Sequence, residues 1–136
     1  MPPRSLEPRS LTLSLTAADL KKSIHFYTEG LGFAVSEKWE EGGVVNGVML
    51  KAGDTLLGLS QDDFAKGRDR SKGIGMRIYI ETAQDLGAIA RQAKSAGIAL
   101  ESEPGPLPWG QVGFSLADPD GYKLTISNPQ DESKKG

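Results

Sequence analysis

The sequence predicts an α+β domain built from two βαβββ modules, because one order of elements occurs twice in a chain of 136 residues. Each half opens with alternating apolar residues, continues with apolar residues at helical spacing and reaches a glycine. The two stretches are "LTLSLTAADLKKSIHFYTEGLG" from residue 11 and "GMRIYIETAQDLGAIARQAKSAG" from residue 75. A chain of this length is sufficient for one domain with a real core and too short for two ordinary ones.

The first module begins with a predicted strand over residues 11–16, in which Leu11, Leu13 and Leu15 point to one face. Asp19 is a predicted N-cap for the helix that follows, since a carboxylate can accept a hydrogen bond from a free N–H of the first turn. Apolar residues recur from Leu20 to Leu31, and Gly30 and Gly32 are expected to end the helix.

The second module follows the same plan. Met76, Ile78 and Ile80 alternate in a predicted strand, Thr82 is the predicted cap, and Gly97 ends the helix. After each helix, turn residues divide the chain into short strands: Gly42-Gly43, Asn46-Gly47, Gly53-Asp54, Pro104 to Pro108 and Pro119 to Gly121.

These boundaries give one domain over residues 10–128, with modules at 10–60 and 74–128. The stretch 60–73, "SQDDFAKGRDRSKG", is charged and rich in turn residues, so it is expected to be an exposed connection with solvated basic side chains. Residues 1–9 and 129–136 lack the apolar content that would offset the entropy of ordering, and are predicted to be flexible tails.

Composition excludes several classes of function. Sixteen basic and eighteen acidic residues give a formal charge of −2, which provides no broad field for nucleic acid or anionic lipid. The absence of cysteine removes disulfides, thiolate nucleophiles and cysteine zinc sites. No apolar run is long enough for a membrane span and no signal peptide is evident, so the expected location is the cytoplasm.

Two motifs carry a resemblance to a known family. "ADLKKSIHFYTEGLGF" at 18–33 and "LADPDGYKLTIS" at 116–127 resemble segments of the vicinal oxygen chelate superfamily, which includes glyoxalase I, extradiol dioxygenases and the bleomycin- and fosfomycin-resistance proteins. The resemblance implies a curled mixed sheet around a cleft, and a homodimer.

In metal-using members of this family, one ligand stands on the first and last strand of each module. The matching positions here are Thr12, Gly58, Gly75 and Thr125. Threonine is a poor ligand for a divalent metal and glycine offers none, so no metal and no cofactor are expected. His25 lies within the first helix and is predicted to be a surface or boundary residue. Scattered acids could still build a new site: Glu37, Glu40, Glu101 and Glu103.

Alternation places Arg77 and Tyr79 on the cleft face. "PWGQVGF" at 108–114 resembles an element that lines the drug cavity of bleomycin-resistance proteins, which implies that Trp109 and Phe114 contact a ligand. The candidate ligand-binding set is Thr12, Trp39, Arg77, Tyr79, Trp109, Phe114 and Thr125. Alternatives are that Arg77 pairs with a glutamate, that Trp109 covers the core or a dimer seam, and that Trp39 is a rim aromatic.

The first hypothesis is therefore a small-molecule-binding protein, similar to the bleomycin-resistance branch, that sequesters a polar or aromatic ligand without a metal and so confers antibiotic resistance. No catalytic residue can be named. The alternative is a metal-dependent lyase, isomerase or dioxygenase with a non-standard site. A third reading is a structural or regulatory partner whose cleft has lost its function.

Overall fold

The computed structural model describes residues 5–68 and 70–129 and forms two four-stranded mixed sheets with few helices. The first module contains β1 (Thr12–Ala17), α1 (Leu20–His25), the π-helical turn η1 (Phe26–Gly30), β2 (Ala34–Glu41), β3 (Val44–Ala52) and β4 (Thr55–Gln61). The second contains β5 (Arg77–Glu81), α2 (Leu86–Ser95), β6 (Ser102–Pro106), β7 (Val112–Ala117) and β8 (Lys123–Ser127). No helix in the described part of the chain is long and apolar enough to span a bilayer.

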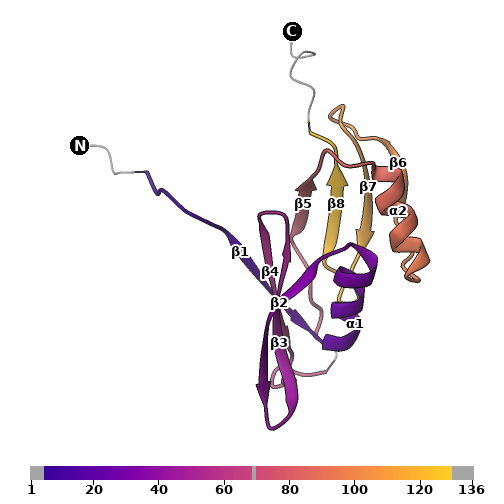
Figure 1. Ribbon diagram of the computed structural model, residues 1–136. Helices are drawn as coiled ribbons and strands as arrows, with labels where there is room; N and C mark the ends of the chain where they lie inside the picture. Colours follow the sequence, from indigo (N-terminus) through magenta and orange to yellow (C-terminus); the bar gives the residue numbers. More distant parts are fainter. Residues whose placement is uncertain (1–4, 69, 130–136) are drawn as a thin grey trace.

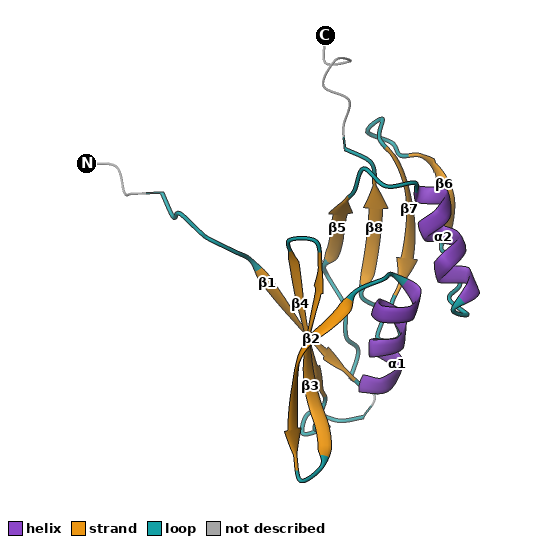
Figure 2. Ribbon diagram, in the orientation of Figure 1, coloured by secondary structure: helices purple, strands orange, loops and turns teal. Residues whose placement is uncertain are grey.

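Both modules have the same topology, and Figures 1 and 2 label their strands and helices. The strand orders are β1-β4-β3-β2 and β5-β8-β7-β6. In each sheet the first and last strands of the module are parallel neighbours, and the remaining pairs are antiparallel. The crossover helix makes this parallel pairing possible, because adjacent parallel strands cannot be joined by a tight turn. The predicted α+β fold of two βαβββ modules is confirmed.

The two helices begin with side-chain caps, one of which differs from the prediction. Asp19 accepts a hydrogen bond from Lys22 N, as expected for the cap of α1. The cap of α2 is Asp85, whose carboxylate accepts from Gly87 N and Ala88 N, so the choice of Thr82 is wrong. Thr82 instead accepts from Gln84 N at 3.2 Å and starts the turn that leads into the helix.

Two predicted strands start later than expected. Leu11 is 81% exposed and lies just before β1, and Met76 likewise precedes β5. Gly75 has a φ of +76°, which only glycine adopts readily, so it turns the chain before β5 and is not part of that strand. Residues 5–10 are exposed and lead away from the sheets (Figure 2). Most of the two predicted tails, residues 1–4 and 130–136, lies outside the described residues.

One hydrophobic core joins the modules. It combines Leu15, Leu57 and Leu59 of the first sheet with Leu124 and other residues of the second, including Phe114, Leu116 and Ile126. These residues occupy every second position of their strands, so the intervening residues face the opposite side of each sheet. The core side of each sheet is buried, and on the other side Arg77 and Tyr79 of β5 are exposed, whereas Thr125 and Ser127 of β8 are covered.

The turn "DPDGY", residues 118–122, fastens the second module to the first. Asp118 Oδ1 accepts from the backbone of Asp120 and of Tyr122, which closes the turn. Asp118 Oδ2 accepts from the Tyr27 hydroxyl at 2.8 Å, and Asp120 accepts from Ala18 N at 3.0 Å. This firm turn thus holds the end of β1 and the first helical segment against the second sheet.

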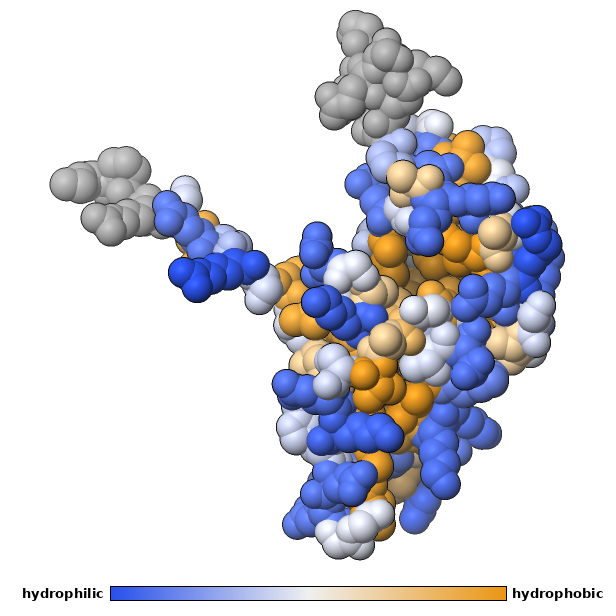
Figure 3. Space-filling view, in the orientation of Figure 1, coloured by the Kyte–Doolittle hydropathy of each residue, from blue (hydrophilic) through white to orange (hydrophobic). Residues whose placement is uncertain are grey.

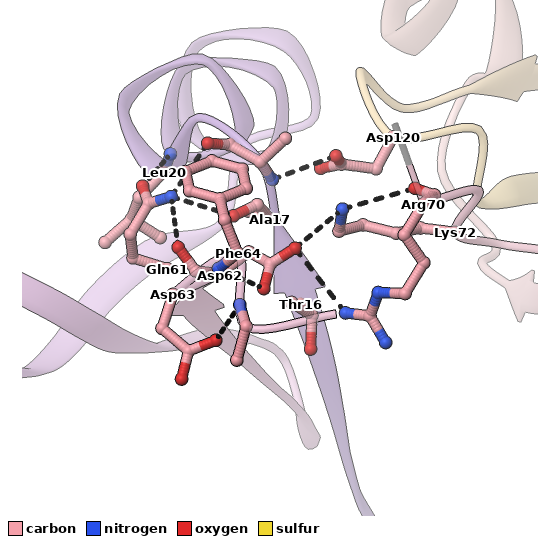
Figure 4. Close-up of polar contacts among 12 residues, drawn as sticks. Thr16, Ala17, Leu20, Gln61, Asp62, Asp63, Phe64, Arg70, Lys72 and Asp120 are labelled. Carbon is pink, nitrogen blue, oxygen red and sulfur yellow. Dashed lines mark hydrogen bonds and ion pairs between the residues drawn. The ribbon is translucent and has the colours of Figure 1, made fainter. Parts of the chain in front are cut away.

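The connection between the modules is tied down at both ends (Figure 4). Lys72 Nζ lies 2.9 Å from Asp62 Oδ2, and Arg70 lies 3.5 Å from the same oxygen. The side chains of Asp62 and Lys72 are only 6% and 5% exposed, so the expectation that the basic residues here are solvated is wrong for Lys72. Together with the backbone N–H of Phe64, the Lys72 ammonium lowers the pKa of Asp62. This pairing fixes the path of the connection.

Candidate functional site

A polar and aromatic surface covers the side of the second sheet that faces away from the core. We call it the second-sheet face. It consists of Arg77, Tyr79, Glu81, Ser115, Lys123 and Thr125, with Trp109 and Gln111 from the connection between β6 and β7. Tyr79 is 61% exposed and Trp109 is 49% exposed. Two large aromatic side chains are thus presented to solvent beside a guanidinium group.

Arg77 is held on this face by hydroxyl groups. Its Nη1 donates to Thr125 Oγ1 at 3.1 Å, and Thr125 Oγ1 is also 3.1 Å from Ser115 Oγ. Thr125 is only 2% exposed, so it lies beneath the arginine as a support. No carboxylate of the described residues forms an ion pair with Arg77, so the alternative of a glutamate partner is not seen there.

The aromatic pair is fixed by Gln111. The rings of Tyr79 and Trp109 meet edge to face, with centroids 6.1 Å apart and planes at 74°. Trp109 Nε1 donates to Gln111 Oε1 at 2.6 Å. The Gln111 amide in turn donates to Asn128 O at 2.7 Å and to Glu81 Oε1 at 3.2 Å. The tryptophan is therefore oriented by a hydrogen-bonded chain and not by burial.

The corresponding face of the first sheet carries the other two candidates. Thr12 lies at the start of β1 and is exposed, and Trp39 lies on β2 and is 48% exposed. Trp39 pairs across the strands with Gly47, where an added Cβ would lie 3.2 Å from its ring. The indole therefore packs closely against the backbone of this glycine. The contacts that join Arg77, Tyr79, Trp109 and Thr125 do not extend to this sheet within residues 5–68 and 70–129.

A family model described as the glyoxalase/bleomycin resistance protein/dioxygenase superfamily matches residues 9–126, which is most of the chain. The protein belongs to this superfamily. A protein of Vibrio cholerae called "probable lactoylglutathione lyase" is 28% identical over 130 residues, which cover 87% of this chain and 88% of the relative.

Solved structures of this superfamily's fold superpose well. A glyoxalase/bleomycin resistance protein/dioxygenase from Nocardioides has a TM-score of 0.71 at 18% identity, with 98% of this chain and 91% of the other covered. TioX from Micromonospora also has a TM-score of 0.71, at 13% identity, with 89% and 98% covered. At these identities the likeness establishes the fold alone.

The residues at the superfamily's metal-ligand positions do not fit a divalent metal. Thr12, Gly58 and Thr125 supply no imidazole and no carboxylate, and Thr125 already accepts a hydrogen bond from the guanidinium of Arg77. A fixed cation at that place would repel a metal ion. Gly75 has no side chain and precedes β5, so its assignment to the first strand of the second module is wrong. Among the described residues, no group of three or more histidine or acidic side chains could hold a metal elsewhere.

His25 and Phe114 lie away from the second-sheet face. His25 is exposed at the end of α1, and its Nε2 lies 2.8 Å from Ala96 O at the end of α2, which agrees with a boundary residue. Phe114 is 0% exposed and pairs with Ile126 in the core. It therefore cannot touch a molecule on the second-sheet face, and we withdraw it from the candidate set.

A separate hollow lies between the modules. It has a volume of about 350 Å³ and is lined on its apolar side by Leu31, Phe33, Ile80, Ile89 and Ile126. In Figure 3 hydrophobic surface gathers along the middle of the molecule, with hydrophilic surface around it. Because Ile80 and Ile126 point to the core, this hollow lies on the core side of the second sheet, and Glu81 is the residue of the second-sheet face that also lines it.

Sequence reasoning missed Gln111, although it stands inside the "PWGQVGF" element. Its side chain connects Trp109, Glu81 and the backbone of Asn128. A glutamine next to a tryptophan in a loop is too common a pattern to reveal this. The one indication was the place of Gln111 in the sequence, directly before β7. From there a half-buried amide side chain can reach the ends of the neighbouring strands.

Proposed function

We propose that the protein binds a small polar or aromatic molecule on the second-sheet face and sequesters it without a metal and without chemical change. The observation that carries this proposal is the fixed group of Arg77, Tyr79 and Trp109 on an otherwise open sheet face. Large aromatic side chains that stay half exposed are costly to leave in water and are typical of binding surfaces.

The geometry favours binding over catalysis. Arg77 and Trp109 each make a hydrogen bond before any ligand arrives, so little side-chain entropy is lost on binding. The described part of this face holds no imidazole or thiol group, and its carboxylate Glu81 is engaged by Gln111. Among the described residues of this face, no acid and base are hydrogen-bonded to each other as a pair that could exchange a proton with a bound molecule.

We further propose that the protein acts as a homodimer in which a second copy covers the exposed edge of the first sheet. All eight residues of β2 are exposed, and Trp39 on this strand is 48% exposed. Edge strands and exposed apolar side chains of this kind are normally covered in stable proteins. Light scattering at micromolar concentration tests this: a dimer mass is expected, and a monomer mass contradicts it.

The direct test of binding uses protein from which metal has been removed. This protein is titrated calorimetrically with a panel of glycopeptide and aromatic antibiotics. Micromolar or tighter binding by at least one compound is expected, with loss of that binding in W109A. Silence across a chemically broad panel would remove the proposal.

A metal-dependent lyase is the second candidate, and the Vibrio cholerae relative called "probable lactoylglutathione lyase" favours it. It would require a ligand set other than the four superfamily positions. Elemental analysis of protein purified without chelator, together with a turnover assay on the hemithioacetal of methylglyoxal and glutathione, separates the two. A stoichiometric transition metal with turnover would place the lyase first.

A further inference from the structure

We infer that the ligand is a planar anion, an aromatic or heteroaromatic acid whose negative group is held by Arg77 and whose ring rests in the corner between Tyr79 and Trp109. This inference rests on the proposed binding function and adds the chemical class of the ligand. It comes from the charge and shape of the second-sheet face.

The first step is the charge that Arg77 leaves unmatched. One guanidinium nitrogen donates to Thr125, and no carboxylate of the described residues pairs with the group. A guanidinium has five N–H donors in a planar fork that matches a carboxylate with two parallel hydrogen bonds. Thr125, itself 3.1 Å from Ser115 Oγ, holds one nitrogen of the fork, and within the described residues no other side chain accepts from the guanidinium.

The second step is that the acids nearby are already engaged. Glu81 accepts from Gln111, and Glu101 lies 3.6 Å from Lys123 Nζ on the same sheet. Neither carboxylate competes for Arg77 within the described residues. Lys123 offsets Glu101, and Glu81 lies four positions from Arg77 along β5. The positive charge is therefore local to the Arg77 guanidinium, and it suits a ligand group of the opposite charge.

The third step is spacing. Arg77 and Tyr79 lie on the same strand and point to the same face, two positions and therefore about 6–7 Å apart. The Trp109 ring stands at 74° to the Tyr79 ring, so the two form a corner with one flat wall each. A one- or two-ring molecule can lie against either wall with its acid group at the guanidinium.

The test uses three probes of one shape and different charge: naphthoate, its neutral amide naphthamide, and the cation naphthylmethylammonium. Each is titrated calorimetrically into wild type, R77Q, T125V and W109A. The matched control is R91Q, which removes an arginine from the exposed side of α2. Melting of each variant without probe establishes that it is folded.

Naphthoate is expected to bind wild type and R91Q about tenfold or more tightly than the other two probes, the scale of a charge-assisted hydrogen bond. R77Q should abolish that preference, and T125V should reduce it because the guanidinium loses its support. W109A should weaken all three probes. Equal binding of the three by wild type, or an unchanged preference in R77Q, overturns the inference and leaves the proposed function standing. Binding of none of them by wild type overturns the inference as well, and the antibiotic panel then decides the proposed function.

Discussion

The Tyr27 hydroxyl donates to Asp118 Oδ2 at 2.8 Å, and this bond joins η1 to the turn between β7 and β8. Both residues are buried, Tyr27 completely and Asp118 to 5% exposure. Burial raises the pKa of Tyr27 far above its ordinary value, and the nearby Asp118 carboxylate adds to that rise. The tyrosine therefore stays protonated and acts as a permanent donor to the turn.

Tyr27→Phe is expected to lower the free energy of unfolding by about 1–3 kcal/mol, because Asp118 then loses a donor while it remains buried. Urea denaturation followed by circular dichroism measures the change. Tyr79→Phe removes a hydroxyl from an exposed ring and should stay within about 0.5 kcal/mol of wild type. Equal losses in the two variants would show that the bond does not contribute.

Asp118→Asn tests the charge at the same junction. Burial raises the pKa of Asp118 in the folded protein, and the hydrogen bond from Tyr27 opposes that rise without cancelling it. A raised folded pKa means that the folded state binds the proton more tightly than the unfolded chain, so wild type loses stability as pH rises from about 4 through the folded value.

The free energy of unfolding of wild type and D118N is measured at several pH values from 4 to 7. The stability of D118N relative to wild type is expected to increase as pH rises. D54N removes a charge at an exposed turn residue and controls for the change in net charge. If wild type instead became more stable relative to D118N as pH rises, the pKa of Asp118 would be lowered, not raised, in the folded protein.

Gly73→Ala probes the contact between the connecting segment and the last turn. A Cβ at Gly73 would lie 2.6 Å from the backbone of Gly121 and Tyr122, and its φ is +68°. Gly67 also has a positive φ, +102°, but has nothing within 4 Å of an added Cβ. G67A should cost about 1–2 kcal/mol from backbone strain alone. G73A should cost a further 1–3 kcal/mol, roughly the cost of overpacking. Thermal melting of both compares them, and matching losses would refute the close contact.

The fold could be predicted from local signals, whereas the candidate site could be predicted only in part. Alternation, the Asp19 cap and the glycine turns depend on neighbours in the sequence, so they predict both modules. Asp85 and Thr82 are both good caps three residues apart, and the packing of α2 decides between them. The Asp62 to Lys72 pair lies across a turn-rich segment that has no periodicity to indicate it.

Within the site, alternation predicted the face of Arg77, Tyr79 and Thr125 because they lie on paired strands. Phe114 was placed by resemblance, although alternation could have corrected it. Ser115 pairs with Thr125 and so shares its face, which puts Phe114 on the other side. The role of Gln111 depends on its contacts with three separate segments of the chain, and no local sequence pattern indicates such contacts.

Gln111→Leu is expected to free Trp109 without unfolding the protein. The variant removes the acceptor of the indole N–H and both donors that anchor the amide. In a Trp39→Phe background Trp109 is the only tryptophan, so its near-ultraviolet circular dichroism and fluorescence anisotropy report its order. Both signals should fall in Q111L and persist in Q92L, which removes a glutamine that bonds to Glu29 O at the end of η1. An unchanged Trp109 signal in Q111L would mean that packing alone orients the ring.

Phe114→Ala is expected to lower stability more than binding, and Trp109→Ala to lower binding more than stability. The reason is that Phe114 lies in the core and Trp109 on the second-sheet face. F114A leaves a cavity at a fully buried position and should cost about 3–5 kcal/mol of stability. W109A removes a half-exposed ring and should cost less than about 1 kcal/mol. Binding of naphthoate should be weakened by W109A and retained by F114A at a temperature where both are folded.

Denaturation compares the stability of the two variants, and calorimetry compares their binding of naphthoate. Should F114A fold too poorly to titrate, F114L keeps most of the volume and tests the same point. Loss of binding in F114L together with intact binding in W109A would return Phe114 to the site and remove Trp109, because alternation along β7 would then have assigned the wrong face.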